Sequence, residues 1–184
     1  MRVSSSLIER LQRSLSLAAL AMSLVVAFGV TQSASAQSLD IKLDSAVSSG
    51  ILLGPSGGDV IIGRSPMLLD FDAAFIFDDD ESVEWVLGSM MQIENRPALA
   101  INPQVRLRRT KGPFESFVGV GIPWYVAPLT RFGTELSFGV ALPLTSPLAL
   151  VLNANVSAFF LGSDLPDDST VFFFNGAAGI RMRF

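Results

Sequence analysis

The sequence contains no cysteine and no histidine among its 184 residues. Without cysteine the chain has no disulfide, no thiol nucleophile and no residue to carry the acyl chains of a lipoprotein. Without histidine it lacks the usual general base, and the absence of both removes the usual zinc ligands. We therefore expect no catalytic residues, no metal site and no cofactor, and a fold held by packing and hydrogen bonds alone.

Long apolar runs are also missing beyond the first 36 residues. The nearest one, FVGVGIPWYVAPL at 117–129, is interrupted by Pro123 and Pro128, so helical membrane spans are not expected. Yet 49% of the residues are hydrophobic and the mean hydropathy is +0.48, which is high for a soluble domain. If this apolar surface meets lipid, strands must present it, and lipid tolerates strands only in a closed barrel.

The N-terminal segment has the order of an export signal. A leader with three arginines precedes an apolar run at 15–30 and a small-residue cleavage site at Ala34 and Ala36. This order predicts a helical, cleavable signal peptide at 1–36. The alternative is an uncleaved membrane anchor, because the apolar run is close to the lower length limit of a spanning helix. The remaining 37–184 suffice for one domain, and the net charge of −4 gives no reason to expect a nucleic-acid partner.

The rest of the chain is a series of alternating segments separated by turn residues. Most are at least as long as the nine to eleven residues that a tilted strand needs to cross a bilayer. In every segment one parity is uncharged and carries most of the bulky apolar residues, whereas the charged residues lie on the other parity. The eight segments are 39–48, 67–77, 83–94, 98–108, 115–126, 132–144, 148–161 and 170–184.

The size of the side chains indicates which parity faces outward. The charged parity also carries small residues such as Gly88, Gly119, Gly139 and Gly179. An eight-stranded barrel encloses a lumen just wide enough for side chains, so small and polar residues suit the inside and bulky apolar ones the outside. The alternative is a soluble, lipocalin-like binding barrel with its apolar face inside. We expect an all-β fold, a single eight-stranded antiparallel up-and-down transmembrane barrel.

The last segment alternates apolar residues up to a terminal phenylalanine, with Ile180, Met182 and Phe184 on one parity. In this ending and in its eight strands the chain resembles the small outer-membrane β-barrels of the OmpA/OmpX type. The resemblance implies an outer-membrane location in contact with lipid, and a C-terminal signal in these three residues that the barrel-assembly machinery reads. It also implies periplasmic chain ends, outer loops at 49–66, 95–97, 127–131 and 162–169, and a monomeric state.

The charged residues of the inward parity predict an ion network that fills the lumen. Bases and acids alternate between neighbouring strands, so each base has an acid nearby. Asp70 and Asp72 could instead form a catalytic carboxylate pair, but the structural interpretation is the stronger one. The predicted network consists of Asp40, Lys42, Asp44, Asp70, Asp72, Glu84, Arg106, Arg108, Glu115, Arg181 and Arg183.

A blocked lumen predicts a structural role, or an interaction role through the outer loops. The alternative function is a narrow porin-like channel for ions or small solutes. Pro103, Pro123 and Pro143 lie inside predicted strands, although each removes a donor from the hydrogen-bond ladder. They predict bulges, or places where the ladder ends near the membrane interface.

Overall fold

The computed structural model describes residues 40–184 except 57–58, 78–81, 95, 129, 164 and 166–168. The chain divides into two units, Met1–Ala36 and Gln37–Phe184, and all described residues belong to the second. The predicted signal peptide at 1–36 and its cleavage site at Ala34 and Ala36 therefore lie outside the described residues. Among the described residues, no helix is long and apolar enough to cross a membrane.

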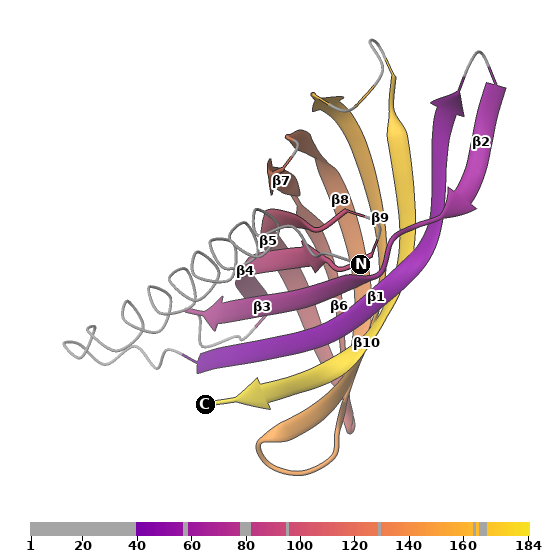
Figure 1. Ribbon diagram of the computed structural model, residues 1–184. Helices are drawn as coiled ribbons and strands as arrows, with labels where there is room; N and C mark the ends of the chain where they lie inside the picture. The colour runs from indigo at the N-terminus through magenta and orange to yellow at the C-terminus, as the bar shows by residue number, and fades with distance from the viewer. Residues whose placement is uncertain are drawn as a thin grey trace, which may run out of the picture. The chain divides into compact units, whose positions relative to one another are not determined.

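The described residues form ten antiparallel strands in one closed sheet (Figure 1). The barrel itself has eight strand positions. β2 extends beyond the barrel, and β6 and β7 follow one another at a single position. Twelve residue pairs between β10 and β1 close it, which confirms the predicted fold. The strands are β1 (Asp40–Ser56), β2 (Asp59–Arg64), β3 (Leu68–Ile76), β4 (Val83–Gln92), β5 (Ala98–Lys111), β6 (Phe114–Gly121), β7 (Trp124–Ala127), β8 (Arg131–Pro143), β9 (Leu148–Gly162) and β10 (Val171–Arg183).

The pairing register fixes the tilt of the strands. A row of paired residues that starts at Lys42 in β1 and passes once around the barrel returns to β1 at Leu52, ten residues further along. Such a stagger in eight strands corresponds to the tilt of about 35–45° that is typical of barrels. The row runs through Ala74, Val86, Gln104, Gly121, Glu135, Ser157 and Phe173.

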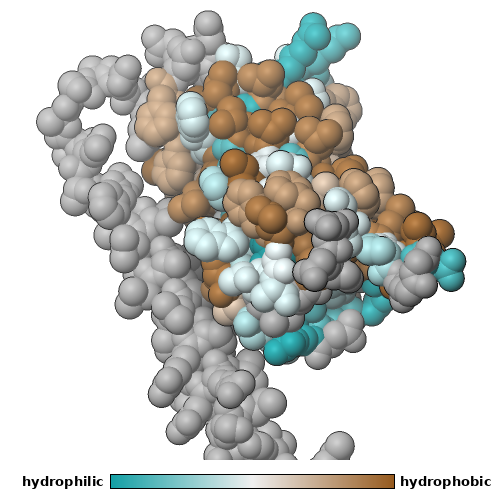
Figure 2. Space-filling model, turned by 90° about the horizontal axis from the view of Figure 1, so that it is seen from above, coloured by the Kyte–Doolittle hydropathy of each residue, from teal (hydrophilic) through white to brown (hydrophobic). Residues whose placement is uncertain are grey.

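The two faces of the wall have the polarity that the alternation predicts. Apolar residues of the bulky parity are exposed, for example Leu43 and Val120, whereas Lys42 and Arg181 of the other parity are fully buried in the lumen. Seen from above, hydrophobic residues cover much of the barrel surface (Figure 2). The lipocalin-like alternative is wrong, because the charges are inside and the apolar side chains are outside.

The segment 49–66 is not the loop that was predicted. β1 continues to Ser56 and turns back into β2, so that this segment is a strand pair that extends beyond β3. In Figure 1 this β1–β2 hairpin stands at the opposite end of the barrel from the C-terminus. We call these two ends the hairpin end and the terminal end.

The three prolines lie where the ladder is interrupted or ends. Pro103 in β5 faces the break between β6 and β7, where Ile122 N donates to the Pro103 carbonyl at 3.1 Å. Pro123 is part of that break, and Pro143 is the last residue of β8. None of these three prolines therefore removes a hydrogen bond from the middle of an uninterrupted strand pair.

Candidate functional site in the barrel lumen

The terminal half of the lumen is filled by ion pairs. Lys42 on β1 donates through Nζ to Glu84 on β4 at 2.8 Å and to Glu115 on β6 at 3.2 Å. Arg108 on β5 contacts the same two carboxylates, Glu84 at 3.5 Å and Glu115 at 2.9 Å. All four side chains are buried, so two bases and two acids form one water-excluded cluster.

A second group of ion pairs continues the cluster toward the middle of the lumen. Arg181 on β10 makes a two-point contact with Asp44 on β1, with Nε–Oδ1 and Nη2–Oδ2 distances of 2.7 and 2.8 Å. Arg106 on β5 pairs with Asp72 on β3 and with Asp44 at 3.4 Å. Arg181 also pairs with Glu115, which joins the two groups into one network.

Phe117 on β6 packs inside this network. The guanidinium carbons of Arg106 and Arg181 lie 4.9 and 5.4 Å from its ring centroid. An aromatic face attracts a cation at this separation, so Phe117 contacts two arginines that also pair with carboxylates. The alternation placed Phe117 on the inward parity, but size alone would have assigned a phenylalanine to the outside.

The pairing differs from the expected one in its partners. Lys42 contacts Glu84 and Glu115, which belong to strands that do not neighbour β1. These ion pairs therefore cross the lumen instead of joining adjacent strands. Arg183 is half exposed at the terminal edge and contacts Glu115. Asp40 and Asp70 take part in no ion pair between described residues.

A buried aromatic cluster, the aromatic cap, lies in the hairpin half of the lumen. Tyr125, Phe159 and Phe173 are buried, and their rings meet edge to face at centroid distances of 5.5 and 5.2 Å. Met90 and Ala100 complete the cluster. Sequence reasoning missed this cap, because it assigned bulky side chains to the lipid face and overlooked that these residues share the parity of the inward charges.

Arg131 lies over the cap at the start of β8. Its guanidinium carbon is 5.5 Å from the Tyr125 and Phe159 centroids and 5.4 Å from that of Phe173. One cation therefore contacts three rings at once, which fixes the cap to β8.

A polar layer separates the ion network from the aromatic cap. Its centre is Glu135 on β8, whose carboxylate accepts from Asn102 at 2.8 Å, from Gln104 at 3.4 Å and from Ser157 at 2.7 Å. Glu135 was not among the predicted network residues, although it lies on the charged parity. All its hydrogen-bond donors here are neutral, so this layer differs from the ion network below it.

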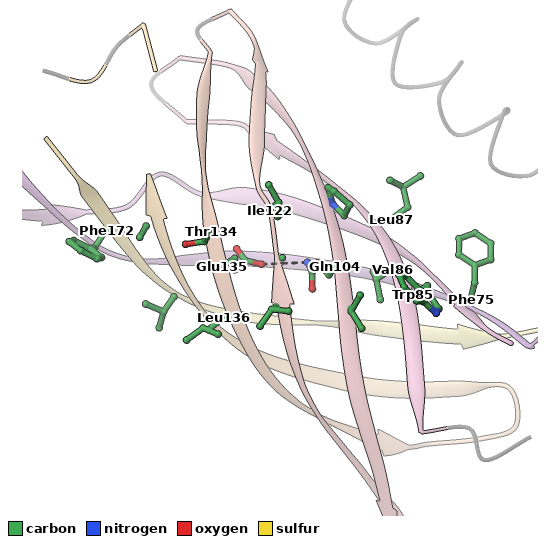
Figure 3. A pocket seen from close by; sticks show the side chains of 16 residues that line it. Phe75, Trp85, Val86, Leu87, Gln104, Ile122, Thr134, Glu135, Leu136 and Phe172 are labelled. Carbon is green, nitrogen blue, oxygen red and sulfur yellow. Dashed lines mark hydrogen bonds between the residues drawn. The ribbon is translucent and has the colours of Figure 1, made fainter. Parts of the chain in front are cut away.

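A groove of about 930 Å³ follows the wall near this layer. Outward apolar residues such as Trp85, Leu87 and Leu136 dominate its lining, while Gln104 and Glu135 are joined by a hydrogen bond (Figure 3). Such a lining suits hydrocarbon chains and offers few groups to a polar substrate.

Polar contacts outside the lumen hold the hairpin end. Arg64 Nη2 at the end of β2 donates to Glu94 Oε2 at 2.5 Å, and the Met67 N–H donates to the same oxygen at 3.1 Å. The hydrogen bond from Arg64, followed by that from Met67, lowers the pKa of the Glu94 carboxyl. This pair fixes the point where the hairpin returns to the barrel wall.

The C-terminal residues lie on the outward face. Ile180, Met182 and Phe184 are exposed, and the Phe184 N–H donates to the Ile41 carbonyl at 3.0 Å. The terminal phenylalanine therefore continues the ladder between β10 and β1.

Comparison with solved structures gives the same fold. The chain is similar to Neisserial surface protein A (NspA), with a TM-score of 0.57, 11% identity, and coverage of 79% of this chain and 97% of that chain. It is also similar to the N-terminal β-barrel domain of Pseudomonas aeruginosa OprF, with a TM-score of 0.51, 7% identity, and coverage of 79% and 97%. No protein-family model and no curated protein matches the sequence. The likeness establishes a small eight-stranded barrel of the kind found in outer membranes.

Proposed function

We propose that the protein is an integral outer-membrane barrel whose lumen is closed by its own side chains, with a structural or surface-interaction role. The observation that carries this proposal is the double closure of the lumen. Lys42, Glu84 and Arg181 are fully buried in the terminal half, and the cap of Tyr125, Phe159 and Phe173 closes the hairpin half. The buried side chains in both halves of the lumen favour this proposal over the alternative of a porin-like channel.

The outward surface supports a membrane location. Aromatic residues lie near both ends of the wall, for example Trp85 and Phe114 toward the terminal end and Trp124 toward the hairpin end. Aromatic girdles of this kind mark the two interfaces of transmembrane barrels. The exposed Ile180, Met182 and Phe184 would be read by the barrel-assembly machinery, and the inserted barrel would be a monomer in contact with outer-membrane lipid.

The β1–β2 hairpin is the surface most available for an interaction. Every residue of β2 is exposed, including Val60, Ile61 and Ile62. Among the described pairings β2 pairs with β1 alone, so one of its edges offers backbone donors and acceptors. An exposed apolar edge strand suits a partner that adds a strand or packs an apolar face.

Fractionation of cells that produce the protein tests the location. We expect the protein in the outer-membrane fraction, extractable with detergent but not with salt or alkali. Without boiling it should run at a different apparent mass in a detergent gel, because folded barrels resist the detergent. A protein recovered in the aqueous fraction, with one band before and after boiling, would contradict the proposal.

A further inference from the structure

β2 has a free edge at the hairpin end of the barrel. β1 pairs with β3 only as far as Ser48, and from Ile51 onward it pairs on that side with β2. Among the described pairings no strand lies against the other edge of β2, and in Figure 1 β2 stands above β3, β4 and β5. The backbone donors and acceptors of this edge are therefore available for pairing with a further strand.

The free edge lacks the features by which proteins keep an edge strand from associating. Such strands usually carry a charged residue, a proline or a bulge where another chain could pair. The centre of β2 is Val60, Ile61 and Ile62, of which Val60 and Ile62 are 74% and 75% exposed. The pairing of β2 with β1 runs without a break in register. The edge is therefore apolar, regular and exposed, which suits pairing with another strand.

The charges of β2 favour a second copy of the same strand as the partner. Asp59 and Arg64 lie at opposite ends of β2. An antiparallel arrangement brings the acid of each copy toward the base of the other, whereas a parallel one brings like charges together. Because both copies use the same free edge, a two-fold axis normal to the sheet must relate them. With this symmetry one residue of β2 lies opposite itself at the axis.

The apolar side chains favour Ile61 as the residue at the axis. With Ile61 there, Val60 of each copy faces Ile62 of the other, so all three apolar residues meet apolar partners. Asp59 of each copy then lies near Arg64 of the other. With Ile62 at the axis, Val60 would face Arg64 instead. Opposed β-branched residues stabilise a strand pair, so the first of these two registers is the better one.

We propose that two copies of the protein associate head to head through antiparallel pairing of their β2 strands, with Ile61 of each copy opposite Ile61 of the other. β2 begins at the tip of the hairpin and ends toward the barrel, so this pairing places the two barrels at opposite ends of the joint sheet. The copies therefore lie in two facing membranes, and each barrel remains a monomer in its own membrane. This inference rests on the proposed outer-membrane location, with the hairpin end outside the cell.

Single cysteines test the register, because the chain has no cysteine of its own. Ile61→Cys places two thiols in a directly opposed antiparallel pair, whose Cα separation of about 4.5–5.5 Å suits a disulfide. Gly63→Cys is the matched control. It is exposed on the same strand, and a Cβ there meets nothing within 4 Å, but the two copies of residue 63 would be roughly 13 Å apart along the strands.

Each cysteine variant is refolded in detergent, shown to be folded by its gel migration without boiling, and oxidised with copper phenanthroline. We expect a covalent dimer from Ile61→Cys and monomer from Gly63→Cys. Equal dimer yields from the two variants would indicate random collision and overturn the proposed pairing. Monomer from both folded variants would overturn it as well.

Vesicle clustering tests the arrangement in facing membranes. The protein is inserted into phosphatidylcholine vesicles, and clustering is followed by light scattering. We expect clustering with the wild type and its loss with Ile61→Lys, which places two like charges opposite each other. Gly63→Lys adds the same charge opposite Asp59 of the second copy, where an acid can pair with it, and should retain clustering.

Two results of the vesicle experiment would overturn the proposal. Vesicles that stay dispersed with folded, inserted wild-type protein would exclude a second copy as the partner and leave the edge of β2 to a different protein. The proposed membrane location would stand in that case, because it is tested by the insertion itself. Clustering that Ile61→Lys and Gly63→Lys change equally would place the contact outside the β2 edge.

Discussion

Arg181 and Asp44 face each other across the seam where the last strand closes against the first. They are paired residues of β10 and β1, and two hydrogen bonds of 2.7 and 2.8 Å join the guanidinium to the carboxylate. Two-point contacts of this kind add geometric specificity as well as energy. The seam of the barrel is therefore held by a buried ion pair in addition to its backbone ladder.

Removing one member of this pair should destabilise the barrel strongly. Arg181→Ala leaves Asp44 and Glu115 buried with fewer partners, and we expect a loss of about 3–5 kcal/mol in the free energy of unfolding. Urea titration in lipid vesicles measures it. Arg64→Ala, which removes an exposed ion pair, should change stability by about 1 kcal/mol or less. Equal losses for the two variants would show that the buried network adds no more to the free energy of unfolding than an exposed ion pair does.

The contribution of a phenylalanine in β9 to stability should depend on whether its side chain points into the lumen or out of the barrel. Phe159 is buried in the lumen, while its neighbour Phe160 is 42% exposed on the outward face. Phe159→Ala should lower the free energy of unfolding by about 3–5 kcal/mol, because it opens a cavity beside Tyr125 and Phe173. Phe160→Ala should have a clearly smaller effect in the same titration. The reverse order would mean that the inward and outward faces of β9 are misassigned.

Gly179 marks a close approach of β10 to β1 at the seam. A Cβ added there would lie 2.1 Å from the Ser45 carbonyl oxygen and 2.5 Å from the Ala46 Cβ. Gly179→Ala should therefore reduce stability by about 1–3 kcal/mol, since neighbouring backbone must shift. At Gly63 in β2 a Cβ meets nothing within 4 Å, so Gly63→Ala should be close to neutral. A neutral Gly179→Ala would contradict the close packing of β10 on β1.

The contact between Glu94 and Arg64 predicts a pH effect at the hairpin end. Because the folded-state pKa of Glu94 is lowered, its interaction stabilises the fold above the ordinary glutamate pKa and is lost as the pH falls through the lowered value. An NMR titration should place the Glu94 midpoint below that of a free glutamate. Arg64→Ala should move the midpoint upward, and no movement would show that Arg64 does not cause the shift.

Alternation predicted the strands of the barrel wall, because the period of two is a direct consequence of strand geometry. The size of the side chains then predicted which face is outward. The β1–β2 hairpin was missed because Gly50, Gly54 and Pro55 indicate a loop. Pro55 is tolerated in β1 because the pairing with β10 ends at Leu53, so no partner there needs its missing N–H.

The ion partners in the lumen could not be predicted from parity. A strand pattern tells which side chains point inward, but the partner across a narrow lumen depends on the stagger of all eight walls. Lys42 thus contacts Glu84 and Glu115 on β4 and β6, whereas the sequence pattern predicted partners on neighbouring strands. Phe159 and Phe173 were overlooked for a related reason. Whether the lumen has room for an inward phenylalanine depends on the size of the residues that face it across the barrel, and the alternation does not identify those residues.

Single-channel recording tests the closed lumen most directly. The purified protein, shown to be folded by its altered gel migration, is inserted into a planar lipid bilayer under an applied voltage. A lumen filled by the ion network and the aromatic cap predicts no unitary current at any voltage that the bilayer withstands. Reproducible current steps from the wild-type protein would contradict a closed lumen and favour a narrow channel.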